Sequence, residues 1–407
     1  MKLPKTGVHR EELFREMRAM KARDADWRGG RTWSLIYPAG EDVDDVLREA
    51  NELYLFENAL NPMRFPSLRA MESDVVAMTT DLLHGDVDAG GTMTSGGTES
   101  ILMAVKTARD RGRAERGITD PEMLVPLSAH PAFAKAAQYL GVRLRHIPLR
   151  ADLRADVDSV ARSLTDQTVL VVGSAPNYPH GVIDPIPELA AVAAEHGVSF
   201  HTDACVGGFL LPFYERLGHP VPLFDFRVPG VTTISADVHK YGYCTKGASV
   251  IAHRSQATLA FQFFLYDAWP GGLYGSPALA GARPAAPIAA SWAVMRYLGE
   301  EGYTRLASVV HATTATIRAG IASIPALRLW GDPDASILAF GSDTLDVMAV
   351  GDRMDDKGWH LDRQRNPDAL HMMVTPNHAR VVDEFLRDLR DAAARHGASR
   401  GVTARYS

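Results

Sequence analysis

Short apolar runs alternate with helical periodicity through the middle of the chain. Runs of roughly four to eight mostly apolar residues bounded by Gly, Pro or Asp are typical of buried strands. Apolar residues spaced three and four apart predict helices at 157–164 and 186–197. Strands are expected at 142–149, 168–176, 198–205, 231–238 and 248–254. This alternation predicts an α/β fold with a mostly parallel sheet that is covered by helices on both faces.

The flanking regions have a different pattern. The first thirty residues are highly charged, and the apolar run at 31–40 predicts an arm that lies against a larger body. Amphipathic helices are expected at 41–57 and 67–85. After a loop rich in Gly and Pro at 271–287, a helix and short strands predict a smaller C-terminal α/β domain. The expected units are an N-terminal arm and helix at 1–55, a large domain at 56–285 and a small domain at 286–407.

Composition narrows the class of protein. A net charge of −6 over 407 residues argues against a general nucleic-acid binder, which usually carries a basic surface. The two cysteines, Cys205 and Cys244, are too few for a disulfide framework and have no metal-ligand spacing to a histidine pair. The charged N-terminus has no apolar signal core, and no run of about eighteen apolar residues follows. We therefore expect a cytoplasmic protein with no membrane span and no metal.

Polar chemistry gathers where the predicted strands end. The segments 173–181, 201–208 and 234–242 each follow an apolar strand, and the carboxyl ends of parallel strands open onto one crevice. Asp203 ends one strand, where a carboxylate needs a cationic partner, although a helix N-cap is the simpler explanation for it alone. Lys240 follows the next strand and would act as a nucleophile if it were desolvated. Alone, it would more often be a solvated lysine.

A glycine-rich loop precedes the helix that starts near Glu99. The segment 91–100, GTMTSGGTES, approximates a nucleotide-binding loop, but Gly97 stands where such a loop needs its lysine. What remains is a phosphate cradle, because glycines let backbone N–H groups approach an anion, Thr98 adds a hydroxyl and the helix adds its positive end. A simple glycine-rich helix cap is an equal alternative for this loop alone.

Taken together, a phosphate cradle, a buried carboxylate and an activated lysine match one cofactor. Pyridoxal 5′-phosphate (PLP) carries a phosphate, a pyridine nitrogen that must stay protonated, and an aldehyde that reacts with a lysine amine. The three groups of this chain occur in an order that would serve each of these parts.

The motifs SGGTESI, HTDACVGGF and SADVHKYGYCTKG resemble those of the group II PLP-dependent decarboxylases of fold type I, and most closely the sphingosine-1-phosphate lyase branch. The similarity runs from about Arg31 to Tyr303. It implies a large domain with a mostly parallel sheet of the seven-stranded type. It also implies that Lys240 forms the Schiff base, that Asp203 pairs with the pyridinium nitrogen, and that His130 stacks on the cofactor ring.

The same resemblance assigns the cofactor phosphate. Gly97 and Thr98 would hold it together with His239. Gly275 and Ser276 would reach it from the other subunit of a homodimer with shared active sites.

On the substrate side, the resemblance places Tyr178 near the reacting bond and makes Lys246 and Tyr37 parts of a substrate-phosphate site, with Tyr37 expected to act across the dimer interface. Two differences from the sequences of this branch lie on the substrate side. Asn61 stands where the branch has a phosphate-binding histidine, and Asn61 can donate a hydrogen bond but carries no charge. Arg283 persists in a loop whose neighbouring Ser and Gly are replaced by alanines.

The resemblance implies a PLP-dependent carbon–carbon lyase of the retro-aldol type, acting on a phosphorylated or otherwise acidic 2-amino-3-hydroxy compound. Lys240, once freed, and Tyr178 are the candidate proton carriers. An amino acid decarboxylase is the first alternative, and an aminotransferase or a carbon–carbon bond-forming enzyme is the second. A non-catalytic binding subunit would belong to a different class, and it predicts no reaction of the cofactor with any amine.

Overall fold

The computed structural model describes residues 2–61 and 63–401, and its centre is a mixed sheet of seven strands. Strands β2 to β6 run parallel to one another, whereas β7 is antiparallel to both β1 and β6. The expectation of a mostly parallel α/β sheet is therefore confirmed. Across the sheet the order is β1 (Gly90–Thr94), β7 (Ser249–His253), β6 (Thr233–Ala236), β5 (Ser199–Asp203), β4 (Thr168–Ser174), β2 (Glu122–Pro126) and β3 (Arg143–Ile147).

Helices bury both faces of this sheet, as its sequence pattern requires. Successive side chains of a strand point to opposite faces, so Met123 and Val125 of β2 pack in one apolar cluster with α4 and α5, while Leu124 packs in another with α7. The helices of this part are α3 (Pro66–Leu82), α4 (Gly97–Arg116), α5 (Ala132–Leu140), α6 (Val157–Ser163), α7 (Ile186–Glu195), α8 (Leu211–Arg216), α9 (Gln256–Ala260) and the 3₁₀ turn η1 (Gly207–Phe209).

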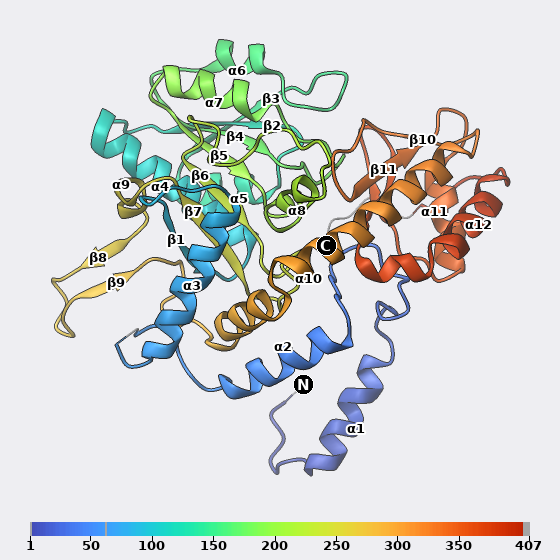
Figure 1. Ribbon diagram of the computed structural model, residues 1–407, viewed down its shortest axis with the longest axis horizontal. Helices are drawn as coiled ribbons and strands as arrows, with labels where there is room; N and C mark the ends of the chain where they lie inside the picture. Colours follow the sequence, from blue (N-terminus) through green and yellow to red (C-terminus); the bar gives the residue numbers. More distant parts are fainter. Residues whose placement is uncertain (1, 62, 402–407) are drawn as a thin grey trace.

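A long helix, α10 (Ala286–Ala322), links the two parts of the molecule (Figure 1). Gly299 interrupts it with φ 54° and ψ −174°, a conformation that glycine adopts without a side-chain clash. Upstream and just downstream of this break, α10 packs in the large core, while Ile317 and Ile321 near its end belong to the core of the C-terminal part. The change from one core to the other thus falls within α10.

The C-terminal part is a small antiparallel sheet covered by helices. Its core includes Trp33 of the N-terminal arm, whose ring stacks on His378 at 3.9 Å and contacts Phe385. The arm thus packs against this part, as its apolar run predicted. The elements are β10 (Arg328–Leu329), β11 (Ile337–Gly341), β12 (Asp362–Gln364), β13 (Ala369–Met373), α11 (Val347–Asp356), α12 (Val382–Ala393) and the 3₁₀ turn η2 (Pro376–Arg380).

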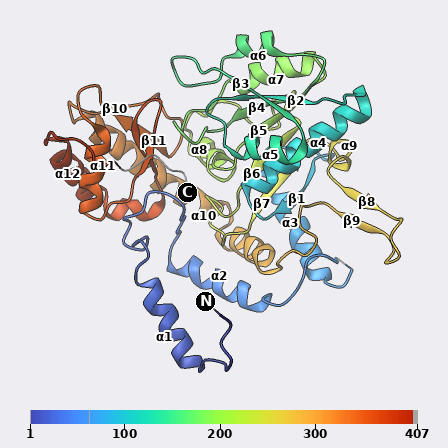
Figure 2. The same ribbon diagram turned by 180° about the vertical axis from the view of Figure 1, so that it is seen from behind.

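Two segments extend from the body in both views (Figures 1 and 2). The hairpin of β8 (Phe264–Tyr266) and β9 (Tyr274–Ser276) projects beyond α9, and helix α1 (Arg10–Lys21) stands away below α2 (Glu41–Leu53) with no buried residue. None of the helices in the described residues is long and apolar enough to cross a membrane.

Candidate active site

The ends of β4, β5 and β6 meet around a cavity of about 290 Å³. Because these strands are parallel neighbours, their carboxyl ends lie along one edge of the sheet, and the polar segments that follow them come together there. Seven residues expected at the site line this cavity: Gly97, Thr98, His130, Tyr178, Asp203, His239 and Lys240.

Lys240 is held in the cavity by a neighbouring carboxylate. Its Nζ lies 3.0 Å from Oδ2 of Asp237, and both side chains are largely buried. Burial alone would lower the pKa of the Lys240 amine, but Asp237 leads a set of neighbours that together raise it above its ordinary value. Burial likewise acts to raise the pKa of Asp237, but its neighbours, led by the charge of Lys240, lower it below its ordinary value. Lys240 is therefore stored as an ammonium paired with a carboxylate, and it must lose a proton before it can attack a carbonyl.

Asp203 ends β5 and is also buried. Its Oδ1 accepts hydrogen bonds from the backbone N–H of Cys205 at 3.1 Å and from the hydroxyl of Ser235 at 3.2 Å. Behind it, His201 lies within hydrogen-bonding distance of Ser235 through Nε2, and burial lowers the pKa of His201 to about 4. Asp203 is thus fixed in orientation by neutral groups, so that its charge remains available to a cation in the cavity.

The glycine loop forms the opposite wall, at the start of α4. Gly96 has φ 153°, and a Cβ on Gly97 would lie 2.7 Å from Sγ of Cys205 and 2.8 Å from Oδ2 of Asp237. Any side chain at position 97 would therefore fill the cavity wall. Glu99 secures the loop, since its Oε2 accepts hydrogen bonds from the N–H and hydroxyl of Ser95 at 2.7 and 2.6 Å. The loop is a rigid, open cradle at the positive end of a helix.

Two histidines of the cavity are neutral near pH 7. Burial lowers the pKa of His130, and its Nδ1 accepts a hydrogen bond from the N–H of Ala132 at 3.1 Å. Burial also lowers the pKa of His239 to about 4, and its Nδ1 accepts from the N–H of Ala248. The Nε2 atom of each ring therefore carries the proton and can donate it.

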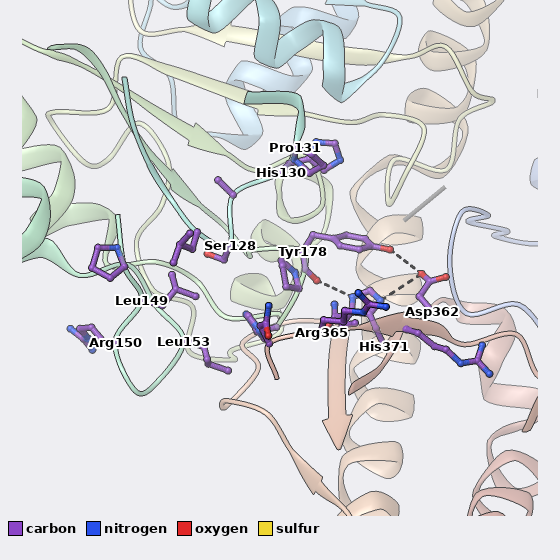
Figure 3. Close-up of a pocket in the computed structure, with 18 residues that line it drawn as sticks. Ser128, His130, Pro131, Leu149, Arg150, Leu153, Tyr178, Asp362, Arg365 and His371 are labelled. Atoms are coloured by element: carbon purple, nitrogen blue, oxygen red, sulfur yellow. Dashed lines mark hydrogen bonds and ion pairs between the residues drawn. The ribbon is translucent and has the colours of Figure 1, made fainter. Parts of the chain in front are cut away.

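Beside this cavity lies a larger pocket of about 730 Å³, which shares His130 and Tyr178 with it (Figure 3). The wall from the large-sheet part includes apolar residues such as Leu149 and Leu153 together with polar ones such as Arg150 and His180. The opposite wall comes from around β12 and is mostly polar, with Arg365 among its residues. Tyr178 thus lies at the boundary between the small cavity and an opening large enough for the rest of a substrate.

At another edge of the site, Lys246 lies over Tyr37. Its Nζ is 4.8 Å from the centre of the Tyr37 ring and donates to the carbonyl of His239 at 3.2 Å. The end of the side chain still reaches solvent, but loss of hydration and the nearby Lys240 lower the pKa of Lys246 to about 8. Tyr37 also contacts Tyr241 edge to face at 5.2 Å. The structure therefore pairs Tyr37 with the Lys246 of its own chain.

Six predicted residues line neither pocket in the part of the chain that the structure describes: Tyr37 and Lys246, placed above, and Asn61, Gly275, Ser276 and Arg283. Arg283 forms a two-pronged ion pair with Glu72, at 2.6 and 2.9 Å, and also donates to the carbonyl of Ala59. Asn61 is exposed, and its Oδ1 accepts from the N–H of Met63. Gly275 and Ser276 lie on the projecting hairpin, where the Ser276 hydroxyl donates to the carbonyl of Ala278.

Two carboxylates that touch predicted site residues were missed in the sequence. Asp237 lies three residues before Lys240, and this spacing was available as a signal. Asp362, which accepts the hydroxyl hydrogen bond of Tyr178, comes from a different part of the chain, and no local pattern connects the two.

The cavity fits a pyridoxal phosphate group. Its glycine cradle has no room for a side chain, its lysine lies near the Asp203 carboxylate, and neutral imidazoles lie beside both. Gly97, Thr98 and His239 would hold the phosphate, Asp203 the ring nitrogen, His130 the ring face and Lys240 the aldehyde carbon. When bound, the cofactor supplies an electron sink for a bond to the amine-bearing carbon of a substrate. The fold and site define a PLP-dependent enzyme of fold type I.

Comparison with known proteins agrees. The family model for the pyridoxal-dependent decarboxylase conserved domain matches residues 32–340. The chain is 43% identical over 398 residues to a sphingosine-1-phosphate lyase of Oryza sativa, covering 96% of this chain and 74% of the relative. It is 44% identical to that of Arabidopsis thaliana, covering 94% and 71%. The structure of a Burkholderia pseudomallei sphingosine-1-phosphate lyase matches with a TM-score of 0.94 and 43% identity, over 97% of this chain and 92% of that one.

The chain therefore belongs to the pyridoxal-dependent decarboxylase family, and within it to the sphingosine-1-phosphate lyases. It is a PLP-dependent lyase, and the resemblance noted in its motifs is confirmed.

Proposed function

We propose that this enzyme cleaves the carbon–carbon bond between C2 and C3 of a phosphorylated 2-amino-3-hydroxy compound of the sphingosine-1-phosphate type, releasing an aldehyde and a phosphorylated amine. The observation that carries the proposal is a pair of lysines close to one cavity: Lys240 lines it, and Lys246 lies at its edge, where it donates to the carbonyl of His239. Lys240 is buried against Asp237, whereas Lys246 reaches solvent over Tyr37. The first suits a covalent bond to the cofactor, and the second suits an anionic group of the substrate.

Each side chain near the two pockets has a separate role in this proposal. Lys246 binds the substrate phosphate with its ammonium, and Tyr37 shields that ion pair from water. His130 and Asp203 keep the reacting centre in one orientation. Tyr178, at the boundary of the two pockets, faces the portion of the substrate that leaves as aldehyde, and the larger pocket receives that portion.

The test is a spectrum followed by product analysis. The purified enzyme with added PLP should absorb in the visible range, and borohydride should fix the cofactor on Lys240, as peptide mass analysis would show. Incubation with a phosphorylated 2-amino-3-hydroxy substrate should then release an aldehyde without carbon dioxide. Carbon dioxide without aldehyde would favour the decarboxylase instead, and failure to bind PLP would overturn the assignment of the cavity.

We also propose that the enzyme works as a homodimer. The β8–β9 hairpin exposes a row of large apolar side chains that water would not otherwise favour, including Leu265 at 67% and Leu273 at 74% exposure. Gly275 and Ser276 lie on the same hairpin, which would carry them toward the cofactor phosphate of a second copy. The cytoplasmic location stays a prediction.

Mixed dimers test this shared site. Inactive Lys240→Ala and Ser276→Ala enzymes, unfolded and refolded together, should recover part of the activity, because each mixed dimer contains one intact site. No recovery in mixed dimers verified by two affinity tags would argue against it.

A further inference from the structure

The hydroxyl of Tyr178 is held by a carboxylate from the C-terminal part of the molecule. Its Oη donates to Oδ2 of Asp362 at 3.1 Å (Figure 3). Asp362 is the first residue of β12, and its other oxygen accepts from the hydroxyl of Ser34 at 3.3 Å. A phenol oxygen is both a donor and an acceptor, so a phenol that donates to a carboxylate can also accept a proton from a third group.

A buried histidine fixes the rest of Tyr178. Nε2 of His371 lies 2.9 Å from the backbone carbonyl of Tyr178, and because a carbonyl only accepts, Nε2 must carry the proton. The two rings also lie 4.5 Å apart. Nδ1 of His371 is 3.7 Å from Oδ2 of Asp362 and has no hydrogen-bond partner among the described residues. Tyr178 is thus held at its backbone, its ring and its hydroxyl by neighbours on β12 and β13.

These contacts lie at the boundary between the two pockets, where the proposed reaction needs a base. Tyr178 lines both pockets, whereas Asp362 and His371 line only the larger one. Tyrosine alone is a poor base near pH 7, because its phenol keeps its proton up to about pH 10. A carboxylate that takes this proton as another arrives removes the need to form a free phenolate.

We propose that Asp362 is a positioning residue and proton acceptor that acts through Tyr178; this inference rests on the lyase function proposed above. As the C2–C3 bond breaks, the 3-hydroxyl proton moves to Oη of Tyr178 and the phenolic proton moves to Asp362. The O–H electron pair becomes the second bond of the aldehyde C=O, and the C2–C3 pair moves to the amine-bearing carbon. A proton returned from Asp362 through Tyr178 to that carbon completes the balance.

The competing explanation is that the contact between Asp362 and Tyr178 only links the two parts of the molecule. Two substitutions of Asp362 distinguish this structural role from the proton relay. Asp362→Asn keeps an oxygen that can accept the Tyr178 hydrogen bond but cannot take up its proton near pH 7. Asp362→Glu keeps the acid–base group on a longer side chain. Asp368→Asn makes the same charge change beyond the same strand, at an exposed position outside both pockets, and serves as the matched control.

The experiment measures kcat, KM and thermal midpoint for these variants of the PLP-loaded enzyme. Asp362→Asn should lower kcat about 100-fold, the usual scale of a lost general base, with KM and the midpoint close to wild type. Asp362→Glu should recover part of kcat, and Asp368→Asn should resemble wild type. Wild-type kcat in Asp362→Asn, or equal losses in both Asp362 variants together with a lowered midpoint, would overturn the relay.

A double-mutant cycle adds a sharper criterion. If Asp362 acts only through Tyr178, Asp362→Asn should have little further effect on kcat in a Tyr178→Phe enzyme. Additive losses would show that Asp362 acts by another route and would overturn the proposal. If the wild-type enzyme releases no aldehyde from any phosphorylated 2-amino-3-hydroxy substrate, the proposed lyase function is wrong. If Asp362→Asn releases aldehyde at the wild-type rate, only the proposed relay is wrong.

Discussion

The two pockets of this enzyme are built in opposite ways. The small cavity around Lys240 is formed by strand ends of one sheet and by the start of α4, and its ion pair joins Lys240 to Asp237, three residues earlier in the chain. The larger pocket lies between the sheet and the β12–β13 region, and its decisive contact joins Tyr178 to Asp362, far apart in the chain. The proposed cofactor site is thus built from one sheet and the helix beside it, whereas the proposed substrate pocket depends on how two parts of the molecule meet.

The largest expected effect separates the two lysines. Lys240→Ala should lower kcat by about 10⁴-fold or more, because the covalent attachment and its amine are lost together. PLP should still bind to the glycine cradle, but borohydride should no longer fix it to the chain. Peptide mass analysis after reduction gives the readout, and Lys246→Ala is the matched control that should keep the attachment. If borohydride fixed PLP on Lys246 of the wild-type enzyme instead, Lys246 would be the attachment residue and the assignment of Lys240 would be wrong.

Replacing the second lysine tests the substrate side of the comparison. Lys246→Gln should raise KM for a phosphorylated substrate about 10- to 100-fold, the scale of a lost charge-assisted hydrogen bond, while the cofactor spectrum stays unchanged. An unphosphorylated analogue should show little difference between the two enzymes. Equal losses on both substrates would mean that Lys246 does not bind the phosphate.

The glycine cradle offers a test on the cofactor side alone. A Cβ on Gly97 would approach the Cys205 sulfur and the Asp237 carboxylate closer than contact distance. Gly97→Ala should therefore weaken PLP binding about tenfold or more through overpacking, with KM for substrate little changed at saturating PLP. Cofactor titration by absorbance measures this, and Gly7→Ala, where a Cβ meets no neighbour within 4 Å, is the control. Unchanged PLP affinity would place the phosphate elsewhere.

The same contrast explains what could be read from the sequence. Lys240, Asp203 and Gly97 were found because short motifs at strand ends carry their chemistry, and the alternation of strands and helices says where those ends lie. Asp362 was missed because its segment reads as a polar loop, and neither apolar period nor spacing shows that β12 returns to Tyr178. Arg283 was expected at the substrate, but in the structure its guanidinium is paired with Glu72. A charged side chain in a loop does not reveal its partner.

The smallest effect, and the most specific to the substrate side, is a pH dependence. The pKa of Lys246 is lowered to about 8, so this amine is cationic below pH 8 and loses its charge above it. A phosphate monoester is already mostly a dianion above pH 7, so KM for the phosphorylated substrate should rise about tenfold between pH 7 and pH 9 as the lysine alone loses its charge. Lys246→Arg keeps its charge throughout this range and should remove the rise. A rise that persists in Lys246→Arg would assign the titration to another group and would separate Lys246 from the phosphate site.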